Sequence, residues 1–296
     1  MKETIQNLLQ KVKKECKSFC HLISIAPFAS GVENCVFKAY TEEWKEVVIR
    51  VPWQRRYIDE QNEYVDTRIS LEKERKLNQH CYDYGIPVPK IHYTHLSDSI
   101  DFIIEEFVAG NDKDIPFLEM GKLTHQLHHI EFLPTILDPN HFTYYLSNRI
   151  VERMKMVEPV LKQQFYLPEP KEIQSILESY PFQLRLLHMD IRPENLIFHN
   201  SKIKAVFDWT NALIGDPVLE LMRIKDYGYL NEDFMEGYEN GEAELARVPD
   251  LVKWFYQIDT SAMLTNLFIT GLNDFKQGEK AKFRLLSLYE RIQKAL

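Results

Sequence analysis

Three oxygen-bearing side chains lie close together in the second half of the sequence. Asp190 and Asn195 are five residues apart in the segment HMDIRPEN, and Asp208 follows after a polar turn. Amide and carboxylate oxygens are ligands that Mg²⁺ prefers, and a carboxylate left free beside them can orient a hydroxyl group or accept its proton. The spacing therefore indicates phosphoryl transfer from a nucleoside triphosphate, with Asn195 and Asp208 as metal ligands and Asp190 as a catalytic residue.

The segments on either side of this turn predict a β-hairpin. Apolar runs at 196–198 and 203–207 flank the polar residues 199–202, which is the pattern of two short strands joined by a turn. Arg192 lies inside the loop, where its guanidinium could meet a phosphate group, and we treat it as a second catalytic candidate. An Asp and an Asn at this spacing are common by themselves, so the predicted hairpin and Pro193 make the signal specific.

The same segment resembles the catalytic loops of two related families. HMDIRPEN is similar to the His-Arg-Asp loop of eukaryotic protein kinases and to the His-Gly-Asp loop of aminoglycoside phosphotransferases, with Met189 as a departure from both. Asp208 is followed almost at once by Gly215-Asp216-Pro217, which leaves no room for an activation segment. The stretch 206–224 therefore resembles the aminoglycoside phosphotransferase family of small-molecule kinases. The resemblance implies that His188 braces the loop and that Asp216 ties the next helix to it.

This resemblance implies an α+β protein-kinase-like fold with two lobes. We expect an N-terminal nucleotide-binding lobe over residues 1–107, with an antiparallel sheet, one helix at 66–84 and a hinge at its end. We expect a mainly helical C-terminal lobe over residues 108–296, which carries the catalytic hairpin and binds the substrate. A chain of 296 residues is long enough for both lobes.

The resemblance also implies which residues of the first lobe contact a nucleotide, ATP or GTP. A turn at Ser30 and Gly31 would cover the phosphates, since small residues let backbone amides approach them. Arg50 stands where protein kinases carry a lysine that positions phosphates, and Glu74 is its expected partner, with Glu72 as the alternative. The hinge would bind the adenine edge through three residues: Glu105, Phe107 and Val108.

The acceptor is less clearly marked. The chain has a formal net charge of −8 and is rich in acidic residues after Asp208, which disfavours nucleic acid and is compatible with a cationic substrate. A neutral or zwitterionic hydroxyl compound is an equal alternative. Four residues are candidates for substrate contact by their place in the resemblance: Trp209, Glu220, Glu236 and Tyr238.

Composition adds expectations about the environment of the protein. No apolar run is long enough to cross a bilayer, and the first residues predict an amphipathic helix. The four cysteines show no metal-binding pattern, which is typical of reduced thiols; they are Cys16, Cys20, Cys35 and Cys81. We expect a cytoplasmic protein, a monomer or weak dimer, with no membrane partner.

Three functions are compatible with these patterns. The leading prediction is a phosphotransferase acting on a hydroxyl of an aminoglycoside-type antibiotic, which would make it an antibiotic-resistance enzyme. The first alternative is a kinase of a metabolite such as a sugar, an amino alcohol or an amino acid. The second is a nucleotide-binding pseudokinase, which the presence of Asp190, Asn195 and Asp208 disfavours.

Overall fold

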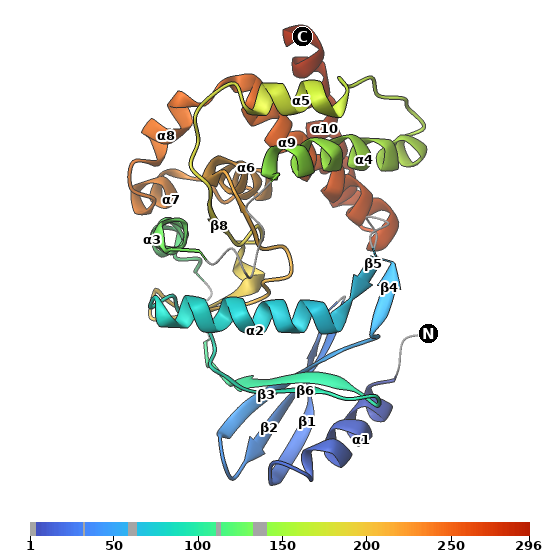
Figure 1. Ribbon diagram of the computed structural model, residues 1–296, viewed down its shortest axis with the longest axis vertical. Helices are drawn as coiled ribbons and strands as arrows, with labels where there is room; N and C mark the ends of the chain where they lie inside the picture. The colour runs from blue at the N-terminus through green and yellow to red at the C-terminus, as the bar shows by residue number, and fades with distance from the viewer. Residues whose placement is uncertain (1–3, 32, 59–63, 111–113, 133–140) are drawn as a thin grey trace. The chain divides into compact units, whose positions relative to one another are not determined.

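The computed structural model describes residues 4–31, 33–58, 64–110, 114–132 and 141–296. The chain divides into two compact units. Of the described residues, the first unit contains 4–31, 33–58, 64–110, 114–115 and 193–210, and the second contains 116–132, 141–192 and 211–296. An antiparallel sheet belongs to the first unit and most helices belong to the second, which confirms the predicted α+β fold (Figure 1).

The first unit is built on a five-stranded sheet with the strand order β1-β2-β3-β7-β6. All neighbouring strands are antiparallel. The strands are β1 (Leu22–Ser30), β2 (Asn34–Thr41), β3 (Lys45–Pro52), β6 (Ile91–Leu96) and β7 (Asp101–Glu106). Residues alternate across β2 and β3, so that Val47, Ile49 and Val51 are all fully buried, as expected for strands with one face on a core.

Helix α1 (Ile5–Cys16) covers part of this core (Figure 1). Thr4 caps the helix by accepting a hydrogen bond from the Asn7 backbone N–H. Leu8 and Val12 lie one turn apart on its buried face and pack with the apolar side chains of β2 and β3. The amphipathic helix predicted at the start of the chain is therefore a structural part of the first unit.

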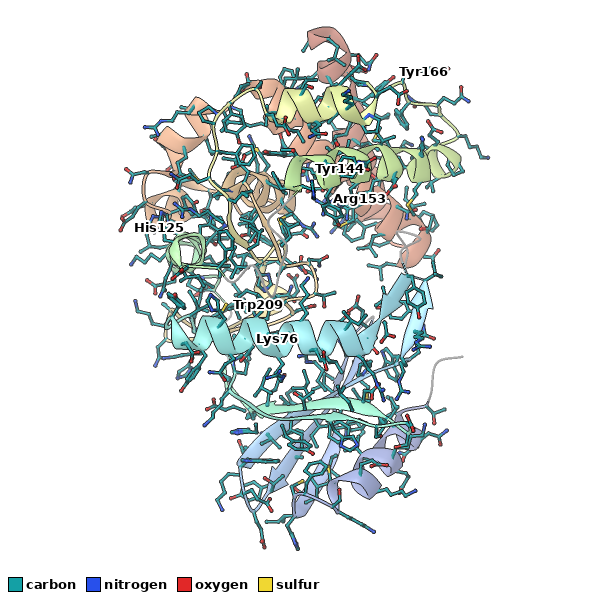
Figure 2. The ribbon with its side chains drawn as sticks, in the orientation of Figure 1. Lys76, His125, Tyr144, Arg153, Tyr166 and Trp209 are labelled. Carbon is teal, nitrogen blue, oxygen red and sulfur yellow. The ribbon has the colours of Figure 1, made fainter. Side chains whose placement is uncertain are left out.

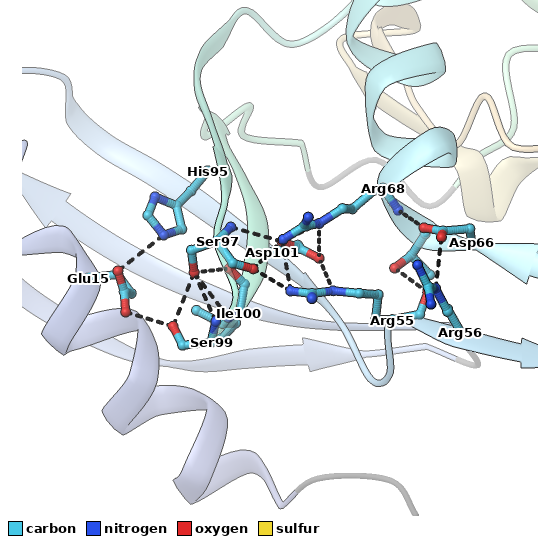
Figure 3. A network of polar contacts seen from close by, with 11 residues as sticks. Glu15, Arg55, Arg56, Asp66, Arg68, His95, Ser97, Ser99, Ile100 and Asp101 are labelled. Atoms are coloured by element: carbon cyan, nitrogen blue, oxygen red, sulfur yellow. Dashed lines mark hydrogen bonds and ion pairs between the residues drawn. The ribbon is translucent and has the colours of Figure 1, made fainter.

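Helix α2 (Thr67–Asp83) is fixed at its start by a buried carboxylate, Asp101, at the beginning of β7 (Figure 3). Asp101 accepts hydrogen bonds from Arg55 Nε at 2.8 Å and from Arg68 Nε at 3.1 Å. Asp66 caps the helix by accepting from the Arg68 backbone N–H at 3.1 Å. Charge-assisted hydrogen bonds are short and strong. This network therefore fixes the start of α2 relative to β7, and with it the residues that α2 carries.

Two small hairpins complete the first unit. One pairs β4 (Arg56–Ile58) with β5 (Tyr64–Asp66). The other pairs β9 (Leu196–His199) with β10 (Lys202–Val206), and the 3₁₀ turn Pro193–Asn195 precedes it. This is the catalytic hairpin expected from the sequence.

The place of this hairpin differs from the expected lobe boundary. The prediction assigned it to residues 108–296, but it packs with the first unit, which also continues to Ile115. The Val206 backbone N–H donates to the Pro87 carbonyl at 2.8 Å. A side chain at Gly110 would come within 2.8 Å of the Phe198 carbonyl oxygen, so only glycine allows this close approach.

The second unit is mainly helical. A short antiparallel pair, β8 (Arg185–Leu187) and β11 (Leu213–Gly215), leads into and out of the catalytic segment. The helices are α3 (Phe117–His129), α4 (Phe142–Leu161), α5 (Pro170–Leu177), α6 (Pro217–Tyr227), α7 (Glu232–Gly237), α8 (Gly241–Arg247), α9 (Asp250–Asn266) and α10 (Phe275–Ala295), with a π-helical turn at Leu267–Gly271. Helix α9 is central, because α4, α6 and α10 all pack against it.

Local sequence explains where these helices begin and end. Asp216 caps α6, Pro217 occupies its first position, and Gly228 ends it in the left-handed conformation with φ 87°. Helix α7 ends at Gly237 and is followed by a separate short helix, α8, that begins at Gly241. Among the described helices, none has both the length and the apolar character that crossing a bilayer requires.

Candidate active site

The two predicted metal ligands lie at the open end of the catalytic hairpin. Leu196 pairs with Val206 in the ladder, and the Phe207 backbone N–H donates to the Asn195 carbonyl at 3.2 Å. Asn195 immediately precedes the first strand, and Asp208 follows two residues after the second. The hairpin thus places a buried amide and a partly buried carboxylate, 13 positions apart in the sequence, at the same end of its ladder. Their oxygens are the donor set that suits Mg²⁺.

Asp208 has a backbone conformation that is unusual for its residue type. Its φ is 69°, in the left-handed region, where a residue other than glycine carries a conformational cost. The next turn of chain is held by α2, since Lys73 Nζ donates to the Thr210 carbonyl at 3.0 Å. Burial lowers the pKa of Lys73 to about 8. The helix that carries Glu74 therefore also anchors the segment that follows Asp208.

Arg50 and Glu74 form a buried ion pair. Arg50 Nη1 donates to Glu74 Oε2 at 2.9 Å, and Nη2 lies 2.7 Å from Oε1. Both side chains are largely buried, and the geometry is the bidentate one that arginine favours with carboxylates. The expected pairing is therefore present, and Glu74 rather than Glu72 is the partner.

A second carboxylate, Glu105, faces the same arginine. Its Oε1 lies 3.5 Å from Arg50 Nε, and burial raises the pKa of Glu105 although Arg50 opposes that shift. The charge of Asp208 also reaches Arg50; burial would lower the pKa of Arg50, but Glu74, Glu105 and Asp208 together raise it. The resemblance marked Glu105 as a hinge residue, and its side-chain contact with Arg50 was not expected from the sequence.

The other predicted nucleotide contacts lie at the ends of strands β1 and β7. Ser30 ends β1, and the Gly31 backbone N–H donates to the Asn34 carbonyl at 2.9 Å, which closes a tight turn. Val32, in the same predicted turn, lies outside the described residues. Phe107 follows β7 and packs edge-on against Phe28 of β1, with ring centroids 5.8 Å apart. Val108 comes next and is partly buried.

Asp190 lies in the second unit, surrounded by hydrogen-bond donors. Tyr227 Oη donates to Asp190 Oδ1 at 2.8 Å, and Arg192 Nε lies 3.1 Å from the same oxygen. Burial alone would raise its pKa, but the charges of Arg223 and Arg192 and the Tyr227 hydroxyl hold the pKa of Asp190 below its usual value. Asp190 is therefore ionised at neutral pH and able to accept a proton.

The buried carboxylate of Glu220 binds the backbone of the catalytic loop. Its two oxygens accept hydrogen bonds from the His188 and Met189 backbone N–H groups, and its Oε2 lies 2.7 Å from His128 Nε2. His188 Nδ1 in turn accepts the Asp190 backbone N–H at 3.2 Å. This contact has the geometry expected of a residue that braces the loop.

Within the described residues, the side chain of Asp216 contacts α6 and α9. It accepts hydrogen bonds from the Val218 backbone N–H at 3.0 Å and from Tyr256 Oη at 2.8 Å. It therefore caps α6 and fastens that helix to α9, whereas the tie to the catalytic loop is made by Glu220. Burial raises the pKa of Asp216 to about 6.

The candidate substrate residues need correction. Glu220, Tyr238 and Trp209 are fully buried, and Tyr238 lies 2.8 Å from His128 Nδ1 through its hydroxyl. Other protein groups pack against all of their side-chain atoms. These three residues are therefore structural and are not exposed to a substrate. Glu236 is exposed on α7 and stays a prediction. The sequence pattern could not separate these cases, because an acidic or aromatic residue after the metal ligand suits either role.

Comparison with known proteins gives the family of this chain. Residues 24–251 match the model of the phosphotransferase enzyme family, APH. The chain belongs to this family. No curated protein shows a significant match.

Solved structures of this family and its relatives share the fold. A thermostable mutant of aminoglycoside phosphotransferase APH(4)-Ia, in ternary complex with ADP and hygromycin B, is 16% identical with a TM-score of 0.65, and the match covers 94% of this chain and 97% of that one. The streptomycin-ATP complex of APH(2")-IIa is 17% identical with a TM-score of 0.59, over 94% and 95% of the two chains. A choline/ethanolamine kinase family protein from Mesorhizobium loti is 17% identical with a TM-score of 0.56, over 92% and 87%.

These findings confirm the protein-kinase-like fold and the resemblance derived from the catalytic segment. Together with the family match, they support a small-molecule phosphotransferase.

Proposed function

We propose that this protein transfers the γ-phosphoryl group of ATP or GTP to a hydroxyl group of a small molecule. One observation carries the proposal: Asn195 and Asp208 lie at the same end of one hairpin, in the same compact unit as the buried Arg50–Glu74 pair. A phosphoryl donor needs metal ligands and a cation that positions its phosphates, and these residues would supply both. Membership of the phosphotransferase enzyme family supports the same reaction.

Each group then has a role in the reaction. Asn195 and Asp208 would hold Mg²⁺, which neutralises charge on the phosphates when it is bound. Arg50, oriented by Glu74, would contact the phosphates, and the turn at Ser30 and Gly31 would lie over them. The adenine would meet the backbone at Glu105, Phe107 and Val108.

Asp190 would act on the acceptor. The acceptor oxygen forms a bond to the γ-phosphorus, the bond from that phosphorus to the bridging oxygen breaks, and the nucleoside diphosphate leaves. The proton of the acceptor hydroxyl passes to Asp190, whose ionised state at neutral pH suits this task. Arg192, beside Asp190, would stabilise negative charge on the transferred group.

Two classes of acceptor are open. An aminoglycoside is supported by the fold shared with enzymes solved with hygromycin B and streptomycin. A metabolite alcohol is supported by the fold shared with a choline/ethanolamine kinase family protein.

The test is a phosphorylation assay of the whole protein with Mg²⁺, ATP or GTP, and a panel of aminoglycosides and metabolite alcohols. We expect transfer to at least one acceptor, and Asp190→Asn to lower its rate by about 10²–10⁴-fold. Asp250→Asn, the same change at an exposed residue at the start of α9, is the matched control and should keep full activity. Undiminished transfer by Asp190→Asn would contradict the proposal, as would a wild-type protein that binds nucleotide but phosphorylates nothing.

A further inference from the structure

A cluster of buried arginines extends from Asp190 into the second unit. Tyr227, whose hydroxyl donates to Asp190, accepts a hydrogen bond from Arg223 Nε at 2.9 Å. Arg223 is only 3% exposed, and the charges of both Asp190 and Asp259 act on it. A continuous polar path thus leads from the catalytic carboxylate through α6 to α9.

Two more arginines meet at Asp259 on α9. Arg149 binds Asp259 with two parallel hydrogen bonds, from Nε at 3.0 Å and from Nη2 at 2.8 Å. Arg153, one turn further along α4 (Figure 2), donates to the same carboxylate from Nη1 at 2.8 Å. The carboxylate is fully buried, and both arginines are more than nine-tenths buried.

The charges of this cluster do not balance. The arginines Arg149, Arg153 and Arg223 face two carboxylates, Asp190 and Asp259, and Arg192 adds a fourth cation beside Asp190. Burial and the positive charges of Arg149 and Arg223 lower the pKa of Arg153, and Asp259 offsets this only in part. An uncompensated buried cation is costly, so the cluster is poised to accept an anion.

Arg153 has a free donor for such an anion. Its Nε is buried and has no hydrogen-bond partner in the described part of the chain. Arg149 donates from Nε and Nη2 to Asp259 and from Nη1 to the Tyr145 hydroxyl, whereas Arg153 donates to Asp259 from Nη1 alone. Arginine binds carboxylates and phosphates with two parallel hydrogen bonds, so the remaining edge of Arg153 fits a compact oxyanion.

We propose that the acceptor of the phosphoryl group carries an oxyanion, a carboxylate or a phosphate, in addition to its hydroxyl, and that Arg153 and Arg223 bind this oxyanion while the hydroxyl faces Asp190. The inference rests on the proposed function, because it assigns the acceptor site of that reaction. It separates this protein from enzymes whose acceptors are polycations: an aminoglycoside would bring more positive charge to a cluster that already has an excess.

The experiment measures binding of four small probes to the whole protein at constant ionic strength, by thermal shift and calorimetry. Glycerate carries a carboxylate, glycerol 3-phosphate a phosphate, glycerol no charge, and ethanolamine a positive charge. We expect one of the two anionic probes to bind and the neutral and cationic probes to bind at least tenfold more weakly, since a hydrogen bond to a charged group is worth about 1.5–3 kcal/mol. The anion that binds identifies the oxyanion as carboxylate or phosphate.

Variants of Arg153 then test whether this residue binds the anion. Arg153→Gln should weaken binding of the anion by about tenfold or more, while Arg247→Gln, exposed at the end of α8, should leave it unchanged. Arg153→Lys keeps the charge but not the planar fork, so it should bind with intermediate affinity. It also keeps the test valid if the glutamine variant fails to fold. Equal binding of all four probes, or anion binding that Arg153→Gln and Arg153→Lys leave unchanged, overturns the inference.

The outcome also distinguishes this inference from the proposed function. Phosphoryl transfer to neutral or cationic alcohols alone would keep the proposed function and overturn the anionic acceptor. Binding of an anion that depends on Arg153, in a protein that transfers no phosphoryl group, would keep the anion site and overturn the reaction.

Discussion

At the scale of single residues, the position of the catalytic loop depends on one buried carboxylate. Glu220 accepts two backbone N–H groups of the loop and contacts His128. Its removal would leave those buried donors unpaired, and an unsatisfied buried polar group is one of the few causes of a large loss of stability.

We therefore expect Glu220→Ala to lower the free energy of unfolding by about 3–5 kcal/mol, as for a broken buried ion pair. Urea denaturation of the two proteins measures the difference. Glu236→Ala, with the same change at an exposed site, should stay within about 0.5 kcal/mol of wild type. Similar losses in the two variants would show that Glu220 does not support the loop.

The sequence predicted the segment that carries the proposed reacting groups better than the residues that hold this segment in place. Asp190, Asn195 and Asp208 follow a recognisable spacing, so their loop and hairpin were predicted. The contacts of Glu105 and Glu220 join residues 55 and 32 positions apart, and no local pattern reveals such pairs. The arginine cluster was missed for the same reason, since Arg149 and Asp259 are brought together only by the packing of α4 on α9.

At the scale of elements, α3 and α7 pack so closely that glycines are required on both. A side-chain carbon at Gly121 would lie 2.0 Å from the Phe234 carbonyl oxygen, and one at Gly237 would lie 2.0 Å from the Leu118 carbonyl oxygen. Backbone atoms of one helix thus fill the space beside the other, and neither can move without shifting a whole helix.

We expect Gly121→Ala and Gly237→Ala each to destabilise the protein by about 1–3 kcal/mol, the usual cost of overpacking. Helix propensity alone predicts the opposite sign, since alanine is better than glycine inside a helix by about 1 kcal/mol. Thermal unfolding of both single variants and the double variant measures the effect. A loss in the double variant smaller than the sum would show that both act on one interface, whereas a gain in either single variant would contradict the close packing.

The order of helices and strands was largely predictable, because each has a clear periodic pattern and end signal. The expected helix at 66–84 is α2 within one or two residues, and its cap is Asp66. The division of the chain was less predictable. The hairpin at 196–206 lies between two segments of the second unit in sequence but packs with the first unit, through contacts with Pro87 and Gly110.

At the scale of the whole molecule, buried acids set how stability depends on pH. Asp226 is buried in the second unit beside Gln257, Ser261 and Arg284, and burial raises its pKa to about 7. The unfolded chain releases this proton near the ordinary value of about 4. Between these values the folded state binds more protons, so the free energy of unfolding falls as pH rises.

We expect wild-type protein to lose stability from about pH 4 to pH 7 through this group, by about 1.4 kcal/mol per pH unit at most. Asp226→Asn should flatten the profile and be more stable than wild type above pH 7. Burial also raises the pKa of Asp216, to about 6, so Asp216 lowers the free energy of unfolding in the same direction. The Asp226→Asn variant should therefore keep a smaller decrease of stability with pH.

Denaturant titrations at several pH values measure both profiles. Asp250→Asn, at an exposed helix start, is the control and should keep the wild-type slope. An Asp226→Asn profile parallel to wild type would contradict the assignment of the slope to this carboxylate.

All four cysteines are buried, and all four belong to the first unit. The second unit contains no thiol in any of its segments. A maleimide dye should therefore leave the native protein almost unlabelled, because burial shields these sulfur atoms and raises their pKa. One cysteine introduced at the exposed Tyr166 would then be the site that accepts a fluorophore, which offers spectroscopy a handle on the helical part of the molecule without removing any native residue from the core.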